Sequence, residues 1–165
     1  MRKPAMVLGA AVLAASCATL SQFSAFVQPP RFEEARDQPA ELTFVPPSGQ
    51  NVLGGANVRL WTRVTNPNPF GFTLASLEGT LYLDEARAAV ADFPLGVPLA
   101  AGAETVIPID LSISFAELPG LANVARQLAD REPVDYRLEG TVAVEAGRLG
   151  TPVFGPMTLV SGEID

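Results

Sequence analysis

The chain contains no histidine, and its single cysteine, Cys17, lies near the N-terminus. Histidine is the commonest general base and the commonest neutral metal ligand, and cysteine is the other frequent nucleophile and ligand. Their absence from residues 18–165 excludes a Ser-His triad and a Cys/His metal site. A single cysteine also excludes an intramolecular disulfide. The sequence therefore predicts neither catalytic residues nor a metal site.

Nucleotide-binding motifs are lacking as well, because the sequence has no G-x-G-x-x-G segment and no P-loop. Acidic residues occur in pairs such as Glu33-Glu34 and Asp84-Glu85, but these lack the spacing of a calcium loop. We interpret them as acids of turns and of a linker rather than as the carboxylate pair of a glycosidase. The sequence predicts a protein that is not an enzyme and that needs no cofactor.

Positive charge is scarce, since the only lysine is Lys3 and the arginines are scattered along the chain. The formal net charge is −7. Nucleic acids and anionic lipid surfaces are bound by clustered lysine and arginine. We therefore expect no nucleic-acid partner, and we interpret the acidic surface as one that keeps the protein soluble.

A hydrophobic run long enough to span a membrane is also missing. Arg2 and Lys3 precede an apolar run over residues 5–15, which is well short of the roughly 20 residues of a transmembrane helix. A basic start, a short apolar run and small residues after it are typical of a bacterial secretory signal. The order Leu13-Ala14-Ala15-Ser16-Cys17 resembles the lipobox of bacterial lipoproteins, although the usual leucine position, three residues before the cysteine, holds alanine.

The lipobox resemblance implies that residues 1–17 are a lipoprotein signal peptide and that Cys17 is lipidated. Cys17 would then attach the protein to a lipid bilayer, and Ala18 after it implies sorting to the periplasmic face of the outer membrane, in the cell envelope. Two alternatives stay open at this point, namely ordinary cleavage near Ala18 and an uncleaved anchor. Loss of the leader would remove Arg2 and Lys3 and change the formal charge from −7 to −9.

The remaining chain divides into a linker and one domain. Residues 18–38 are polar, contain proline and lack a clear period, which predicts a flexible tether. Residues 39–165 carry the apolar residues of a domain of ordinary size. Within them, residues 58–65 and 77–83 alternate between apolar and polar side chains, as strands do. Asn66-Pro67-Asn68-Pro69 between them predicts a rigid corner, because proline fixes φ and removes a backbone donor.

Further alternating segments predict more strands over residues 41–45, 106–115, 134–145 and 152–164. Residues 86–93 are a weaker strand candidate, and the prolines and glycines of residues 94–102 suit an irregular sheet edge. Residues 116–131 have apolar residues at helical spacing, which predicts one short amphipathic helix on the core. About seven strands and a single helix predict an all-β fold, an antiparallel immunoglobulin or fibronectin-III-like β-sandwich.

The corner and its flanks resemble the signature of the LEA type 2 family, also called the water stress and hypersensitive response (WHy) domain. The resemblance rests on the strand ending at Thr65, then Asn66, Pro67, Asn68, Pro69, Phe70 and Gly71, and then the strand ending Leu81-Tyr82-Leu83-Asp84. It covers about residues 40–162. It implies a β-sandwich that protects proteins or membranes during desiccation and other stress, without catalysis.

Two hypotheses follow for the function. The first is a non-enzymatic, stress-protective lipoprotein that shields protein clients or the membrane. The second is an immunoglobulin-like adaptor that binds an envelope protein through a sheet edge or through the helix of residues 116–131. Trp61 and Tyr82 lie at polar-face positions of their strands and are candidate surface contacts, with packing across the strand pair as the alternative.

Overall fold

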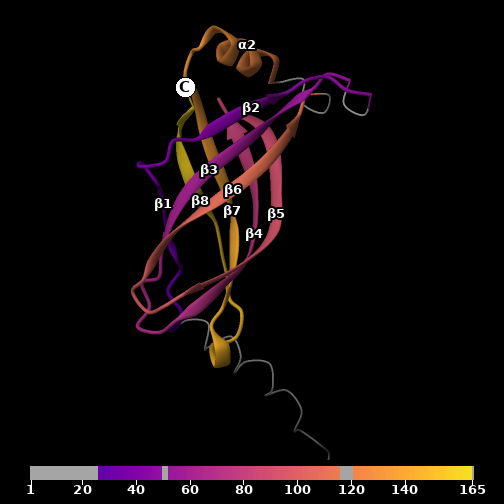
Figure 1. Cartoon of the computed structure of the whole chain (residues 1–165). Coiled ribbons are helices and arrows are strands. Elements are labelled where there is room, and N and C mark those ends of the chain that lie inside the picture. Colours follow the sequence, from indigo (N-terminus) through magenta and orange to yellow (C-terminus); the bar gives the residue numbers. More distant parts are fainter. Residues whose placement is uncertain (1–25, 50–51, 116–120, 165) are drawn as a thin grey trace, which may run out of the picture.

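Two antiparallel sheets pack face to face in the computed structural model, which describes residues 26–49, 52–115 and 121–164. Figure 1 shows the sandwich with the α-helix α2 (Ala122–Asp130) at one end. The first sheet contains β1 (Arg31–Glu34), β2 (Glu41–Val45), β3 (Gly55–Thr65) and β6 (Glu104–Ser114). The second runs in the order β5-β4-β7-β8 and contains β4 (Phe72–Leu83), β5 (Ala86–Leu99), β7 (Val134–Glu145) and β8 (Val153–Ile164). The predicted all-β sandwich is confirmed.

Strand alternation places one face of each sheet in the core. In β3, Val58, Leu60 and Val64 are almost fully buried, while Arg59, Trp61 and Arg63 between them face outward. The other long strands supply the same kind of row, and their fully buried members include Leu74, Leu77, Leu81, Ile109, Leu138 and Leu159. Burying these side chains is the main source of stability, at roughly 1.5–3 kcal/mol for each large aliphatic residue.

The first sheet is organised around β3. β6 pairs with β3 over its whole length, from Gly55 opposite Ser114 to Thr65 opposite Glu104. A strand has only two edges, so β1 and β2 share the other edge of β3. β1 pairs with its C-terminal part and β2 with its N-terminal part.

β1 corrects the predicted tether. Residues 31–34 form a strand of the sheet, and the neighbouring Val27 and Ala35 are buried to 4% and 0% exposure. The tether prediction of residues 18–38 is therefore wrong from Val27 onward, and its first part, residues 18–25, lies outside the described residues, as does the signal peptide. The described part of the chain has eight strands rather than about seven. The additional strand is β1, which pairs with β3 although its own sequence has no strand pattern.

β5 is longer than its sequence predicted. It continues from the weak candidate segment through Pro94, Gly96 and Pro98 to Leu99, and it is an edge strand of the second sheet. Proline is tolerated there because an edge strand has one side without ladder hydrogen bonds. A tight turn at Asp84 and Glu85, with φ of 44° and 65°, joins β4 to β5.

The predicted helix is α2 (Ala122–Asp130), and it lies at one end of the sandwich (Figure 1). Leu121 and Val124 are buried in the main core cluster, so the helix packs on its own sandwich. Residues 116–120, which the prediction included, lie outside the described residues. In the part of the chain that the structure describes, no helix has the length and apolar content to cross a bilayer.

Candidate functional site

The Asn-Pro-Asn-Pro corner is a buried hydrogen-bonded junction. Asn66 and Asn68 are 0% and 1% exposed, although both are polar. The Asn66 Nδ2 group donates to the carbonyl oxygens of Phe70 at 2.8 Å, Ala100 at 3.0 Å and Leu99 at 3.3 Å. Its Oδ1 atom accepts from the backbone N–H of Asn68 at 2.9 Å and from Asn68 Nδ2 at 3.0 Å. One side chain thereby joins the β3–β4 connection to the end of β5.

Asn68 extends this junction to the N-terminal segment. Its Oδ1 atom accepts from the Gln28 backbone N–H at 2.8 Å, and its Nδ2 group donates to the Gln28 carbonyl at 2.9 Å. Buried amides that satisfy backbone groups in this way stabilise a unique geometry. Both amides direct their polar atoms inward, and Pro69 and Gly71 are the exposed members of the motif. The motif residues therefore form a structural joint, and their amides are occupied by the protein itself.

Trp61 lies on the outer face of β3 beneath an arginine. The Arg59 guanidinium is 5.9 Å from the centre of the Trp61 ring. Arg59 is held by Asp110 of β6, the residue next to it across the strand pair, with Nε–Oδ1 at 2.6 Å and Nη2–Oδ2 at 3.2 Å. This hydrogen bond and the charge of Asp110 raise the pKa of Arg59. Trp61 is half-buried, so it packs along its own strand and also remains accessible.

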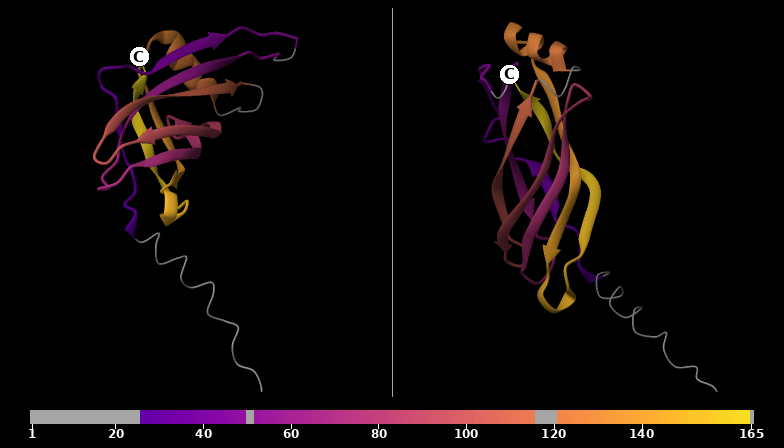
Figure 2. Two further views of the ribbon diagram at one scale, coloured as in Figure 1. Left: turned by 60° about the horizontal axis from the view of Figure 1, so that its bottom comes forward. Right: turned by 90° about the vertical axis from the view of Figure 1, so that its right-hand side faces the viewer.

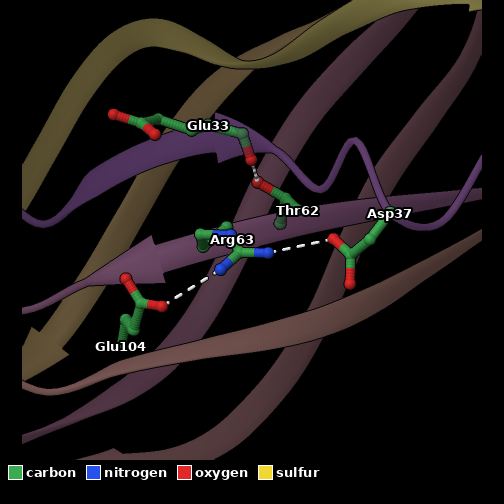
Figure 3. Close-up of polar contacts among 5 residues, drawn as sticks. All are labelled: Glu33, Asp37, Thr62, Arg63 and Glu104. Atoms are coloured by element: carbon green, nitrogen blue, oxygen red, sulfur yellow. Dashed lines mark hydrogen bonds and ion pairs between the residues drawn. The ribbon is translucent and has the colours of Figure 1, made fainter.

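Arg63, two residues further along β3, links three elements of the first sheet. Figure 3 shows its guanidinium between two carboxylates. Nη1 lies 3.0 Å from Glu104 of β6, and Nη2 lies 2.9 Å from Asp37, which follows β1. Next to it, the buried Thr62 hydroxyl lies 3.2 Å from the Glu33 carbonyl and 3.2 Å from the Leu159 carbonyl of β8 (Figure 3 shows the first). Arg63 thus holds the β1 segment on the outer face of the sheet, and Thr62 holds β1 on the buried face.

Tyr82 has an equivalent arrangement on the second sheet. Its register partner on β7 is Arg137, whose guanidinium lies 5.3 Å from the ring centre. Arg137 is 3.2 Å from Glu85 through Nη2 and 3.2 Å from Glu139 through Nε. The Nε contact lies outside hydrogen-bond geometry, so it is an ion pair and not a hydrogen bond. Packing across the strand pair, the alternative named for Tyr82, is what the structure contains.

Beside Tyr82, a hollow of about 360 Å³ is lined by residues of β7 and β8. Tyr136 lines this hollow, and its hydroxyl is 3.2 Å from Glu34 Oε1 of β1. Burial raises the pKa of the Tyr136 phenol, and the negative charge of Glu34 raises it further. A phenol that stays protonated is a hydrogen-bond donor to Glu34 and not a general base. The contact therefore connects β1 to the second sheet.

The outer faces of the two sheets supply paired charges and two aromatic rings. Among residues 26–49, 52–115 and 121–164, no three acidic, histidine or cysteine side chains converge as a metal site would require. Sequence reasoning named Trp61 and Tyr82 but missed their arginine partners, because the pairing depends on position in the fold. It also missed an exposed apolar group at the β2–β3 hairpin, which is described below. Cys17 lies outside the described residues.

The two-sheet architecture defines a class of small, all-β sandwich proteins. In this chain the Asn-Pro-Asn-Pro motif stabilises the fold, because its amides are bonded to other groups of the protein. The sequence matches the late embryogenesis abundant protein family LEA_2 over residues 62–157. The chain belongs to this family, which is related to water stress and is generally non-enzymatic. The matched region runs from β3 to β8 and includes the corner.

Solved structures resemble the fold at low sequence identity. A protein of Arabidopsis thaliana, determined in solution, has a TM-score of 0.55 and 18% identity, and the match covers 75% of this chain and 76% of that one. A protein of Archaeoglobus fulgidus has a TM-score of 0.44 and 14% identity over 77% and 93% of the two chains. A third, provisionally assigned to the late embryogenesis abundant proteins, has a TM-score of 0.44 and 16% identity over 79% and 72%. No curated protein sequence matches significantly.

Proposed function

We propose that this protein is a non-enzymatic envelope lipoprotein that protects other proteins from aggregation when water is withdrawn. In this proposal Cys17 carries the lipid and holds the folded domain at the periplasmic face of the outer membrane. The family membership supports the link to water stress. The lipobox-like order before Cys17 supports the anchor.

The observation that carries the proposal is the pairing of the outward arginines of both sheets. Arg59, Arg63 and Arg137 each have a guanidinium nitrogen within 3.2 Å of a carboxylate oxygen. In water such exposed pairs contribute little, about 0–1 kcal/mol each. Coulomb attraction strengthens as the effective dielectric constant falls, so these contacts gain strength as the protein dries. A domain with this surface stays folded under the stress against which it protects.

The surface also suits a shield. The formal charge of −7 opposes association between copies of the protein, and the carboxylates that remain unpaired keep it hydrated. Placed between partly unfolded client molecules, an acidic folded domain would separate them and slow their aggregation. Protection by this route requires no catalysis and no bound cofactor.

Two experiments test the function. A deletion strain and its parent are dried and osmotically shocked, and we expect lower survival without the protein. In parallel, purified protein is dried with lactate dehydrogenase, and we expect more recovered activity and less light scattering than with an equal mass of serum albumin. Equal survival together with equal scattering would contradict the proposed protection.

The proposed lipid anchor at Cys17 is tested separately. Cells are labelled with radioactive palmitate, with and without globomycin, which blocks cleavage of lipoprotein signals. We expect labelled protein from the parent sequence and none from Cys17→Ala, and we expect globomycin to cause the uncleaved form to accumulate. A fully soluble periplasmic protein that carries no label would contradict the anchor but leave the protective activity to be judged by the drying assay.

A second candidate function is an adaptor for one envelope protein. It is favoured by the projecting β2–β3 hairpin, whose exposed apolar residues form a contact surface of a kind that marks protein interaction sites. Recovery of a single stoichiometric partner from unstressed cells, lost when this hairpin is altered, would support the adaptor over the shield.

A further inference from the structure

The β2–β3 hairpin carries apolar side chains that the core does not cover. Phe44 is 49% exposed, Val52 73% and Leu53 61%. Phe115, at the end of β6, contacts this group, with its ring centre 6.5 Å from that of Phe44. We call Phe44, Val52, Leu53 and Phe115 the apolar tip. Figure 2 shows the hairpin projecting beyond the rest of the sandwich, which explains why the second sheet does not cover it.

Charge is absent from the sequence of this hairpin. Between Glu41 and Arg59 there is no acidic or basic residue, although charged residues make up 18% of the chain. The arginine-carboxylate pairs that cover the rest of the first sheet begin at Arg59. An exposed apolar surface with no charge of its own can contact another chain without leaving a charge buried.

The edge of β2 offers backbone hydrogen bonds beside the apolar tip. Among the described residues β2 pairs only with β3, so its other edge has no partner strand. Of the other edge strands, β5, β6 and β8 contain proline, at Pro94 and Pro98, at Pro108 and at Pro156. β1 has no proline, but charged side chains, which also blunt an edge, occupy three of its four positions. Proline blunts an edge against pairing, and β2 has none. β2 is therefore the edge on which an added strand is least opposed.

We propose that the edge of β2 and the apolar tip bind an extended, apolar segment of a partly unfolded protein as an added strand. This inference rests on the proposed protective function and names the part of the client that is recognised. Backbone bonds along β2 would provide affinity without sequence specificity, and the apolar tip would select alternating apolar side chains. The net charge of −7 favours a segment that is flanked by lysine or arginine.

Two other occupants fit less well. A second copy of the protein would add a formal charge of −7 to the same complex, and the repulsion opposes a dimer through β2. The anchoring bilayer is disfavoured by position, because Gln28 is bonded to Asn68 at the β3–β4 corner, at the end of β3 opposite the hairpin. Figure 1 shows the start of the coloured chain at that end of the sandwich. Phe26 lies nine residues after Cys17, and even fully extended this segment spans at most about 30 Å, so a lipid on Cys17 would stay near that end of the sandwich.

The test compares two double variants of the full chain. Val52→Ser with Leu53→Ser removes the exposed aliphatic residues of the apolar tip. Val90→Ser with Val153→Ser removes two residues of similar exposure, 60% and 64%, from strands of the other sheet. The probe is a fluorescein-labelled peptide of alternating valine and threonine with lysines at both ends, and binding is followed by fluorescence anisotropy. Circular dichroism and urea unfolding verify that both variants fold.

We expect the Kd for the peptide to rise at least tenfold in the tip variant and less than twofold in the matched control. A peptide with glutamates at its ends should bind several-fold more weakly than the lysine peptide at low salt. Amide hydrogen exchange should slow in residues 41–45 when the peptide is added, because these amides gain bonds only if the peptide adds to the edge of β2.

The outcomes separate the inference from the function on which it rests. Protection in the drying assay that is unchanged in the tip variant, with no peptide binding by the parent, would overturn the inference and leave the shield in place. No protection by the parent would overturn the shield, and the anisotropy and exchange data would still decide the binding site. A β2-dependent dimer in analytical ultracentrifugation, or tip-dependent binding to phosphatidylglycerol vesicles in place of the peptide, would also overturn it.

Discussion

Replacing Asn66 by alanine removes the side chain that fixes the corner between β3 and β4. Five hydrogen bonds are lost, three that its Nδ2 group donates to carbonyls and two that its Oδ1 atom accepts from Asn68. The variant leaves a backbone N–H and a side-chain N–H of Asn68 without this acceptor in a site that is about 1% exposed. An unsatisfied buried donor costs about 1–3 kcal/mol, and carbonyls that lose one of two partners cost less.

These contributions sum to a loss of about 3–5 kcal/mol in the free energy of unfolding. Because small domains are stable by only about 5–15 kcal/mol in total, the variant should unfold at a much lower urea concentration. The matched control is Asn57→Ala, because Asn57 is exposed and accepts one hydrogen bond, from Ser112 Oγ at 3.0 Å. It should lose less than about 1 kcal/mol.

The assay is urea unfolding followed by tryptophan fluorescence and by circular dichroism. Coincident transitions and an unchanged m-value would show that the variant lowers the free energy of unfolding and does not alter the compactness of the unfolded state. If Asn66→Ala loses no more than about 1 kcal/mol beyond Asn57→Ala, the buried amide junction does not hold the corner, and our interpretation of the motif is wrong.

Three further perturbations test the packing of the sandwich. Burial and Glu34 raise the pKa of Tyr136, so the folded protein keeps a proton that the unfolded chain loses near pH 10. The free energy of unfolding should therefore be unaffected by this group below about pH 10 and fall above it. Tyr136→Phe should reduce this alkaline fall, measured as the urea midpoint against pH. Equal slopes for the two proteins would contradict this. Gly140→Ala places a Cβ against the backbone of β4 and should cost about 2 kcal/mol or more, whereas Gly49→Ala, where a Cβ meets open space among the described residues, should stay within about 0.5 kcal/mol. Leu138→Ala, at 0% exposure, should cost about 2–5 kcal/mol in the same titration, and a loss below 1 kcal/mol would contradict the assigned core.

The long strands were predictable because their side chains alternate over many residues. Val58, Leu60 and Val64 on one face and Arg59 and Arg63 on the other identify β3 without knowledge of its neighbours. β1 was missed because a four-residue strand with one apolar side chain contains too little pattern. Its place depends on β3, about 30 residues later in the chain, which no local signal reveals.

The site was predicted only in part for the same reason. Proline spacing showed that the chain turns at Pro67 and Pro69, but the acceptors of Asn66 include carbonyls at positions 99 and 100. Alternation placed Tyr82 on an outer face, whereas its contact with Arg137 follows from the register of β4 against β7. The turn at the corner follows from the local sequence, whereas the contacts between distant strands do not.

The bonds between Gln28 and Asn68 also determine how the domain responds to mechanical force. Tension applied to the N-terminal residues reaches the folded body first at Val27 and Gln28, which precede β1. Two short hydrogen bonds must break there before any load passes to β1 and its ladder with β3. These two bonds should therefore break first, and in the proposed lipoprotein a pull on the N-terminus would detach a few N-terminal residues while the sandwich stays folded.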